Sequence, residues 1–141
     1  MKIFRKNADY AVRTLVFLAT QGGSQEHPGY ISTTTLAKEL GLPLNYLRRI
    51  CSKLIKAGIL DTREGAGGGI RLLKNAADIT ILELMELLDG PPEISDCTFQ
   101  KKVCANRKSC VLRRRILEIE KKVILEFGTI TIQSLIDDLS A

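Results

Sequence analysis

Apolar residues recur at helical spacing near the start of the chain. Between Asn7 and Thr20 they share one face, which predicts an amphipathic helix built on Ala8, Ala11, Val12, Leu15, Val16, Leu18 and Ala19. Residues 21–30 contain three glycines and a proline, so a loop is expected there. His27, the only histidine of the chain, is interpreted as a solvated residue of this loop.

Two short helices separated by a tight turn are predicted next. Ser32 and Thr33 are suitable N-caps for a helix over residues 34–40, which Gly41 ends. Pro43 suits the first turn of the following helix, which runs to about Ala57. Its apolar positions lie on one face and are Leu47, Ile50, Cys51, Leu54 and Ile55.

A β-hairpin is expected after the second of these helices. Residues 59–61 and 70–73 have the pattern of two short strands, and the glycine-rich segment 63–69 joins them. The order helix, tight turn, helix and hairpin is typical of a winged helix-turn-helix. The predicted fold class is therefore mainly α with a small β-hairpin wing, followed by a long C-terminal dimerisation helix.

The C-terminal half is predicted to hold three helices and a cysteine-bearing loop. Helices are expected over 79–88, over 110–127 with Gly128 closing it, and over 130–139. The long helix carries an apolar stripe, which an intramolecular face could explain but a partner helix explains better: Leu112, Ile116, Ile119, Val123 and Phe127. The expected units are a DNA-binding domain (1–90), a cysteine loop (91–110) and a dimerisation and terminal-helix module (111–141).

The composition narrows the classes of protein. A hydrophobic fraction of 45% supports a packed core, and a net charge of +5 suits nucleic acid without being specific for it. No segment reads as a signal peptide or reaches the roughly 20 apolar residues of a membrane span. We therefore expect a cytoplasmic protein with reduced thiols and no membrane partner. No catalytic motif indicates an enzyme.

The second helix of the predicted helix-turn-helix carries the candidate DNA contacts. Asn45, Tyr46 and Arg48 are expected to reach base edges, and Arg49 and Lys53 to contact phosphates. In the wing, Gly67 and Gly68 would allow the backbone to approach DNA closely, with Arg63 and Arg71 on either side. The alternatives are a solvated basic helix face and an ordinary hairpin turn.

Cys97, Cys104 and Cys110 form a C-x6-C-x5-C array with four basic residues between them. These gaps are wider than those of a zinc knuckle and suit a loop around an iron–sulfur cluster, although the kind of metal stays open. Three unconnected free thiols are the alternative. Cys51 falls on the apolar face of its helix and is interpreted as a buried structural thiol.

Taken in order, these segments resemble the IscR/NsrR family of winged-helix transcription regulators. The resemblance rests on DYAVRTLVFLA, GLPLNYLRRI, the wing GAGGGIRLLKNAADITILELMELLDG, the three cysteines and TIQSLIDDL. It implies that Cys97, Cys104 and Cys110 hold a 2Fe–2S or 4Fe–4S cluster. It also implies a homodimer that binds a pseudo-palindromic operator on double-stranded DNA.

The resemblance also bears on the fourth cluster ligand and on the wing. IscR-like members have a histidine where this chain has Arg113, whereas NsrR-like members use an aspartate of the first helix, supplied by the other subunit. Asp9 matches that aspartate, and a helix-N-terminal acid favoured by the macrodipole is the alternative. The first cysteine gap is not the commonest one of the family, so it does not select a cluster type. Family wings often place arginine where Glu64 stands, and Arg63 is the candidate replacement.

These observations predict a homodimeric transcription regulator, most simply a repressor, whose cluster state alters its affinity for DNA. The signal could be nitric oxide, iron or cluster supply, or oxidative stress. Three alternatives remain open: a cluster-free thiol switch of the same family, a small redox or metal-binding protein, and a protein-interaction module built on the long helix.

Overall fold

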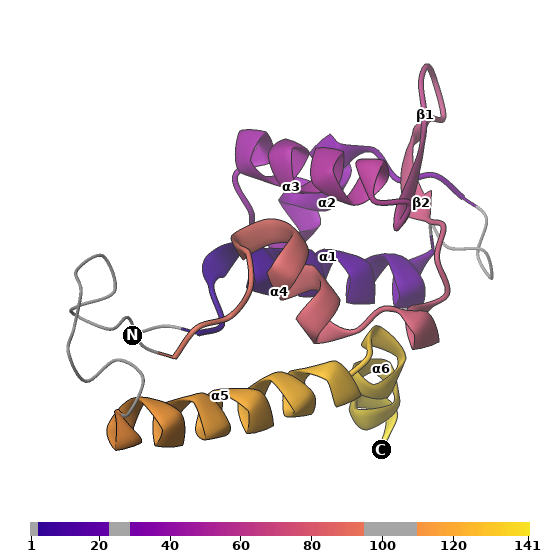
Figure 1. Ribbon diagram of the computed structural model, residues 1–141. Helices are drawn as coiled ribbons and strands as arrows, with labels where there is room; N and C mark the ends of the chain where they lie inside the picture. Colours follow the sequence, from indigo (N-terminus) through magenta and orange to yellow (C-terminus); the bar gives the residue numbers. More distant parts are fainter. Residues whose placement is uncertain (1–2, 23–28, 95–109) are drawn as a thin grey trace.

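The computed structural model describes residues 3–22, 29–94 and 110–141 (Figure 1). His27, Cys97 and Cys104 lie outside these ranges. The elements, in chain order, are α1 (Lys6–Gln21), α2 (Thr33–Leu40), α3 (Leu44–Lys56), β1 (Leu60–Arg63), β2 (Gly69–Leu72), a 3-10 turn η1 (Ala76–Asp78), α4 (Ile81–Asp89), α5 (Val111–Thr129) and α6 (Ile132–Ser140).

The helix-turn-helix forms as predicted, and its local causes are visible. The hydroxyl of Ser32 caps α2 by accepting a hydrogen bond from the Thr35 amide at 3.1 Å. Gly41 ends α2 in the left-handed conformation, with φ of 65°, where a side chain would be strained. Pro43 stands directly before α3 and cannot continue a helix that starts upstream of it.

The wing is the antiparallel hairpin of β1 and β2, in which Leu60 faces Leu72. Its second strand also pairs with the segment before α2, through reciprocal backbone hydrogen bonds between Ile31 and Ile70. Gly69 makes this approach possible, since a Cβ there would lie 2.1 Å from the Ile31 carbonyl oxygen, at a φ of +141°. The second strand lies one residue before its predicted position, whereas the first begins one residue later than predicted and ends two residues later, at Arg63.

The core is centred on α1, which contacts α2, α3, α4, α6 and the wing. Ala8, Ala11, Leu15 and Leu18 form its buried face and are fully inaccessible to solvent. The same core includes Ile132 of α6, which is also fully buried. Helix α6 therefore completes the hydrophobic core that also supports the helix-turn-helix and the wing.

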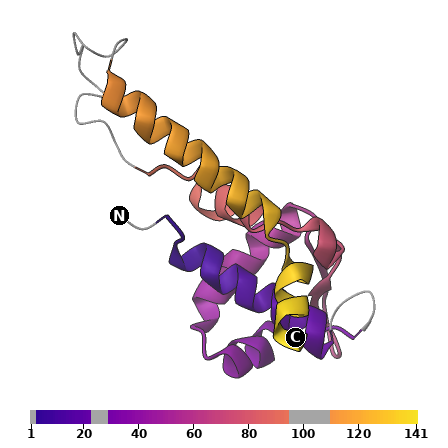
Figure 2. The same cartoon turned by 90° about the horizontal axis from the view of Figure 1, so that it is seen from below.

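Helix α5 extends along α4 and away from the rest of the domain (Figure 2). The prediction that Gly128 closes it is wrong, because the helix continues to Thr129. Gly128 lies beside Leu82 of α4, and the chain turns only at Ile130, whose carbonyl accepts a hydrogen bond from the Ile81 amide at 2.9 Å. No helix in the described ranges is both long and apolar enough to cross a membrane.

Candidate nucleic-acid interface

Helix α3 has one face that is buried and another that is exposed and basic. Its inward side chains are buried in the core: Leu47, Ile50, Cys51 and Leu54. The predicted contact residues Asn45, Arg48, Arg49 and Lys53 are all exposed. Within the described part of the chain, none of these three cations forms an ion pair, so their charges are available to an external anion.

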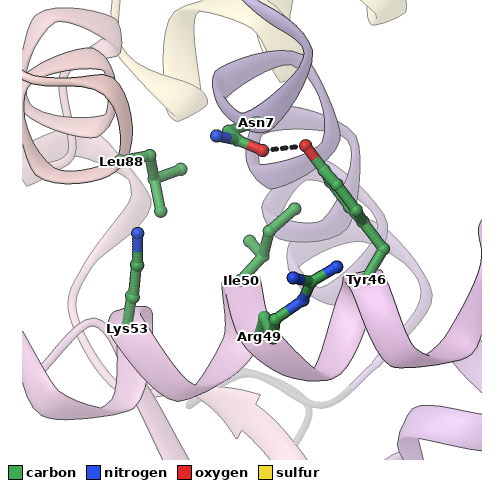
Figure 3. A pocket seen from close by; sticks show the side chains of 6 residues that line it. All are labelled: Asn7, Tyr46, Arg49, Ile50, Lys53 and Leu88. Carbon is green, nitrogen blue, oxygen red and sulfur yellow. Dashed lines mark hydrogen bonds between the residues drawn. The ribbon is translucent and has the colours of Figure 1, made fainter.

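Tyr46 differs from the other predicted base readers because it is half-buried against α1 (Figure 3). Its hydroxyl donates a hydrogen bond to the side-chain oxygen of Asn7, and its ring packs edge-on against Tyr10 at 5.3 Å between centroids. The Asn7 amide in turn donates to the Asp89 carboxylate at 2.8 Å. The hydroxyl is therefore directed toward α1, and base reading by Tyr46 stays a prediction.

The base of the wing is held by a polar cluster that sequence reasoning did not find. The Tyr30 hydroxyl donates to Asp61 Oδ2 at 2.7 Å, and Arg71 Nε donates to the same oxygen at 3.2 Å. The Arg71 guanidinium also lies over the Tyr30 ring, 5.0 Å from its centroid. Arg71 is thus oriented by contacts within the protein, whereas Arg63 is exposed and lies over the same Tyr30 ring, 6.0 Å from its centroid, without an ion pair among the described residues.

Of the predicted wing glycines, Gly67 is exposed and adopts a positive φ of 76°. Gly68 has an internal reason to be glycine, because a Cβ there would lie 2.2 Å from the Arg63 carbonyl oxygen. The tight turn alone therefore accounts for Gly68, and close approach of either glycine to DNA stays a prediction.

The wing cluster predicts a pH-dependent stability. The Tyr30 hydroxyl, followed by Arg71, lowers the pKa of Asp61, while the hydrogen bond to Asp61 raises the pKa of Tyr30. A carboxyl whose pKa is lower in the folded state stabilises the fold at every pH above its ordinary pKa, which is 3.8 for aspartate. That contribution is lost as the pH falls through the lower pKa of the folded state. Asp61→Asn should therefore lower the thermal midpoint at pH 7, and the difference from wild type should shrink below about pH 4.

Thermal unfolding of both proteins between pH 3 and pH 8 measures this difference. Asp78→Asn is the matched control, since Asp78 is exposed and its carboxylate makes no hydrogen bond or ion pair among the described residues. A pH-independent difference, or one no larger than that of the control, would contradict the assignment.

The predicted metal ligands are only partly within the described ranges. Cys110 caps the start of α5, where its sulfur accepts a hydrogen bond from the Arg113 amide at 3.5 Å. A helix N-terminus favours a negatively charged group, and the thiolate is the form that binds metal. Where the structure describes the chain, no group of three or more His, Cys, Asp or Glu side chains gathers as a metal site.

Asp9 and Cys51 have contrasting surroundings. Both carboxylate oxygens of Asp9 accept hydrogen bonds from Arg13 Nε at 3.2 Å, and the Asp9 side chain is 37% exposed. Cys51 is buried, and this burial raises the pKa of its thiol to about 12. The interpretation of Cys51 as a buried thiol is confirmed, and its protonated sulfur is a poor ligand.

Comparisons with known proteins place this geometry in a family. The family model described as "Rrf2: Iron-dependent Transcriptional regulator" matches residues 4–138, nearly the whole chain. The chain belongs to the Rrf2 family. Its members are DNA-binding transcription regulators rather than enzymes, so the predicted class of protein is confirmed.

Named relatives of this Rrf2-family protein include two that correspond to the predicted resemblance. It is 26% identical to the transcriptional repressor NsrR of Streptomyces coelicolor, over 93% of this chain and 86% of that one. It is 25% identical to the regulator IscR of Xenorhabdus nematophila, over 90% of this chain and 74% of that one. The resemblance stated from the sequence is therefore confirmed.

Among solved structures, CymR, the global cysteine regulator of Bacillus subtilis, has the same fold. It superposes with a TM-score of 0.76 at 24% identity, over 97% of this chain and 98% of that one. The fold class, mainly helical with a two-stranded wing, is confirmed.

Proposed function

We propose that this Rrf2-family regulator is a homodimeric repressor whose affinity for its operator depends on an iron–sulfur cluster. The observation that carries the DNA-binding part is the exposed basic face of α3 beside the wing. Asn45 and Arg48 are exposed on this face and read base edges, while Arg49, Lys53 and Arg63 contact phosphates.

Helix α5 supports the dimer part of the proposal. None of its residues is buried, and Leu112 and Leu125 are 69% and 70% exposed. A 19-residue helix with large apolar side chains in water gains stability by packing against another copy. A two-fold dimer presents two α3 helices to two half-sites of a pseudo-palindromic operator.

The chemistry of Cys110 and Asp9 supports the cluster part. A cysteine at the first turn of α5 and an aspartate on the surface of α1 supply a thiolate and a carboxylate, and Cys97 and Cys104 would supply two further thiolates. When bound, the cluster supplies reactivity toward nitric oxide or oxidants and a dependence on iron. In this proposal Cys110, at the start of α5, would bind the cluster. The fourth ligand would be Asp9 of the partner subunit, whose carboxylate would have to break its hydrogen bonds with Arg13.

A cluster-free thiol switch is the second candidate. It is favoured by the likeness of the fold to CymR and by the half-buried sulfur of Cys110 at a helix N-terminus. Iron and sulfide analysis after anaerobic purification and reconstitution separates the two candidates, because only the cluster protein retains both elements.

The DNA-binding proposal predicts that Arg48 carries part of the sequence preference. After selection of a site from genomic DNA fragments, Arg48→Ala should weaken binding to that site by about 5- to 150-fold, the worth of a good base contact. Binding to unrelated DNA should change much less. Fluorescence anisotropy at fixed salt measures both affinities.

Arg114→Ala is the control for this experiment, because it removes the same charge from an exposed position on α5. If wild-type protein enriches no site from the pool, the regulator proposal is wrong. If Arg48→Ala loses affinity equally for all DNA, Arg48 contacts phosphate rather than a base.

A further inference from the structure

Two cations of α3, Arg49 and Lys53, line one small pocket beside this helix. The pocket has a volume of about 220 Å³ and lies between α1, α3 and α4 (Figure 3). Its apolar lining is Ile50 and Leu88, and Arg49 and Lys53 form part of its wall. From the sequence, Arg49 and Lys53 are each expected to contact phosphates, and no residue of α1 is expected to join them.

Lys6 of α1 joins these cations through the rings of two tyrosines. Its Nζ lies 5.3 Å from the centroid of Tyr46 and 5.4 Å from that of Tyr10. The Arg49 guanidinium lies 5.4 Å from the same Tyr46 ring. Two cations therefore converge on one aromatic side chain, which attracts both but neutralises neither.

No acidic side chain forms an ion pair with these cations within the residues the structure describes, and the second oxygen of the Asp89 carboxylate, Oδ2, is buried without a hydrogen-bond partner there. Lys6, Arg49 and Lys53 form no ion pair there, and the nearby carboxylate of Asp89 accepts its hydrogen bond from Asn7. The side-chain oxygen of Asn7 is itself occupied by the Tyr46 hydroxyl. Lysine and arginine offer only donors, so the pocket suits an anion rich in acceptor oxygens.

We propose that this pocket binds a phosphate of the DNA backbone, with Lys6, Arg49 and Lys53 as its donors. This inference rests on the proposed DNA-binding function and adds α1 to the interface. The pocket lies between the first turn of α1 and the length of α3 from Tyr46 to Lys53, whereas the wing follows the C-terminal end of α3 (Figure 1).

Tyr46 acts in this arrangement as a positioning residue. Lys6 and Arg49 each lie over its ring, while Asn7 and Asp89 fix its hydroxyl through two successive hydrogen bonds. The contact explains why a tyrosine in the first turn of the recognition helix lies against α1 rather than toward solvent.

The salt dependence of DNA binding by the full chain tests whether this pocket binds a DNA phosphate. Each phosphate contact contributes about 0.9 to the slope of log K against log salt. Lys6→Ala should lower this slope by up to about 1, and should weaken binding roughly three- to tenfold at 0.1 M salt, for the selected site and for unrelated DNA alike. Lys6→Arg keeps the charge and should restore most of the slope.

Lys121→Ala is the matched control, since it removes one exposed lysine from α5, on the other side of α1 and α4 from α3 (Figure 1). If the slope of log K against log salt is the same for Lys6→Ala as for wild type, the proposed phosphate site is wrong, while the regulator proposal is unaffected. Wild-type protein without salt-dependent DNA binding overturns both. Calorimetric binding of inorganic phosphate that depends on Lys6, with an unchanged DNA slope, assigns the pocket to free phosphate instead and overturns the proposal.

Discussion

Replacing Leu47 with Ala is expected to lower the free energy of unfolding by about 2–5 kcal/mol. Leu47 lies in the first turn of α3 and is fully buried in the core. The substitution removes buried apolar surface and leaves a cavity that the surrounding helices fill only in part. Because a domain of this size is stable by about 5–15 kcal/mol in total, this is a large fraction of its stability.

Urea unfolding followed by circular dichroism measures the change from the shift of the midpoint at constant slope. Leu139→Ala is the control with the same change in side chain, and at 74% exposure it should cost less than about 1 kcal/mol. If both variants lose the same free energy of unfolding, burial of Leu47 does not hold α3 against the core.

Replacing Cys110 with Ser is expected to abolish cluster binding and, with it, the effect of the cluster on DNA affinity. Serine is itself a good N-cap, so α5 should keep its start while losing the sulfur that is the proposed ligand. Allosteric couplings commonly change affinity by about 5- to 150-fold. In Cys110→Ser the ratio of operator affinities measured under reconstituting and iron-free conditions should fall to about one.

Iron and sulfide content, visible absorption and operator affinity are the measurements. Cys51→Ala is the matched control, because it removes a cysteine whose buried, protonated thiol plays no part in the proposed site. Full iron content in Cys110→Ser would remove Cys110 from the ligand set. A wild-type protein that holds no iron after reconstitution would contradict the cluster proposal and leave the thiol switch.

The helix-turn-helix could be predicted because its signals are local. Ser32, Gly41 and Pro43 act on backbone groups within a few residues of themselves, so their effect does not depend on the rest of the fold. The spacing of Leu47, Ile50, Cys51 and Leu54 likewise places them on one face of any helix that forms there. These four are buried as their pattern predicts, whereas Ile55, the fifth apolar residue of the predicted face, is only half-buried at its margin.

The partners of polar side chains could not be predicted in the same way. Tyr46 and Asn7 are 39 residues apart, and Asn7 and Asp89 are 82 apart. The sequence supplied each side chain but no sign of which would meet. The same holds for Tyr30 and Asp61, whose contact depends on how the wing folds back toward the start of α2.

The sequence by itself therefore determined the order of the elements, the basic exposed face of α3 and the family, since periodicity, capping and motif order are properties of the chain. Tertiary packing decided that Tyr46 lies against α1, that Lys6 and Arg49 both lie over its ring, and that Ile132 completes the core. These features arise because burial of the apolar faces sets how the helices lie, and only then do distant side chains come within reach of one another.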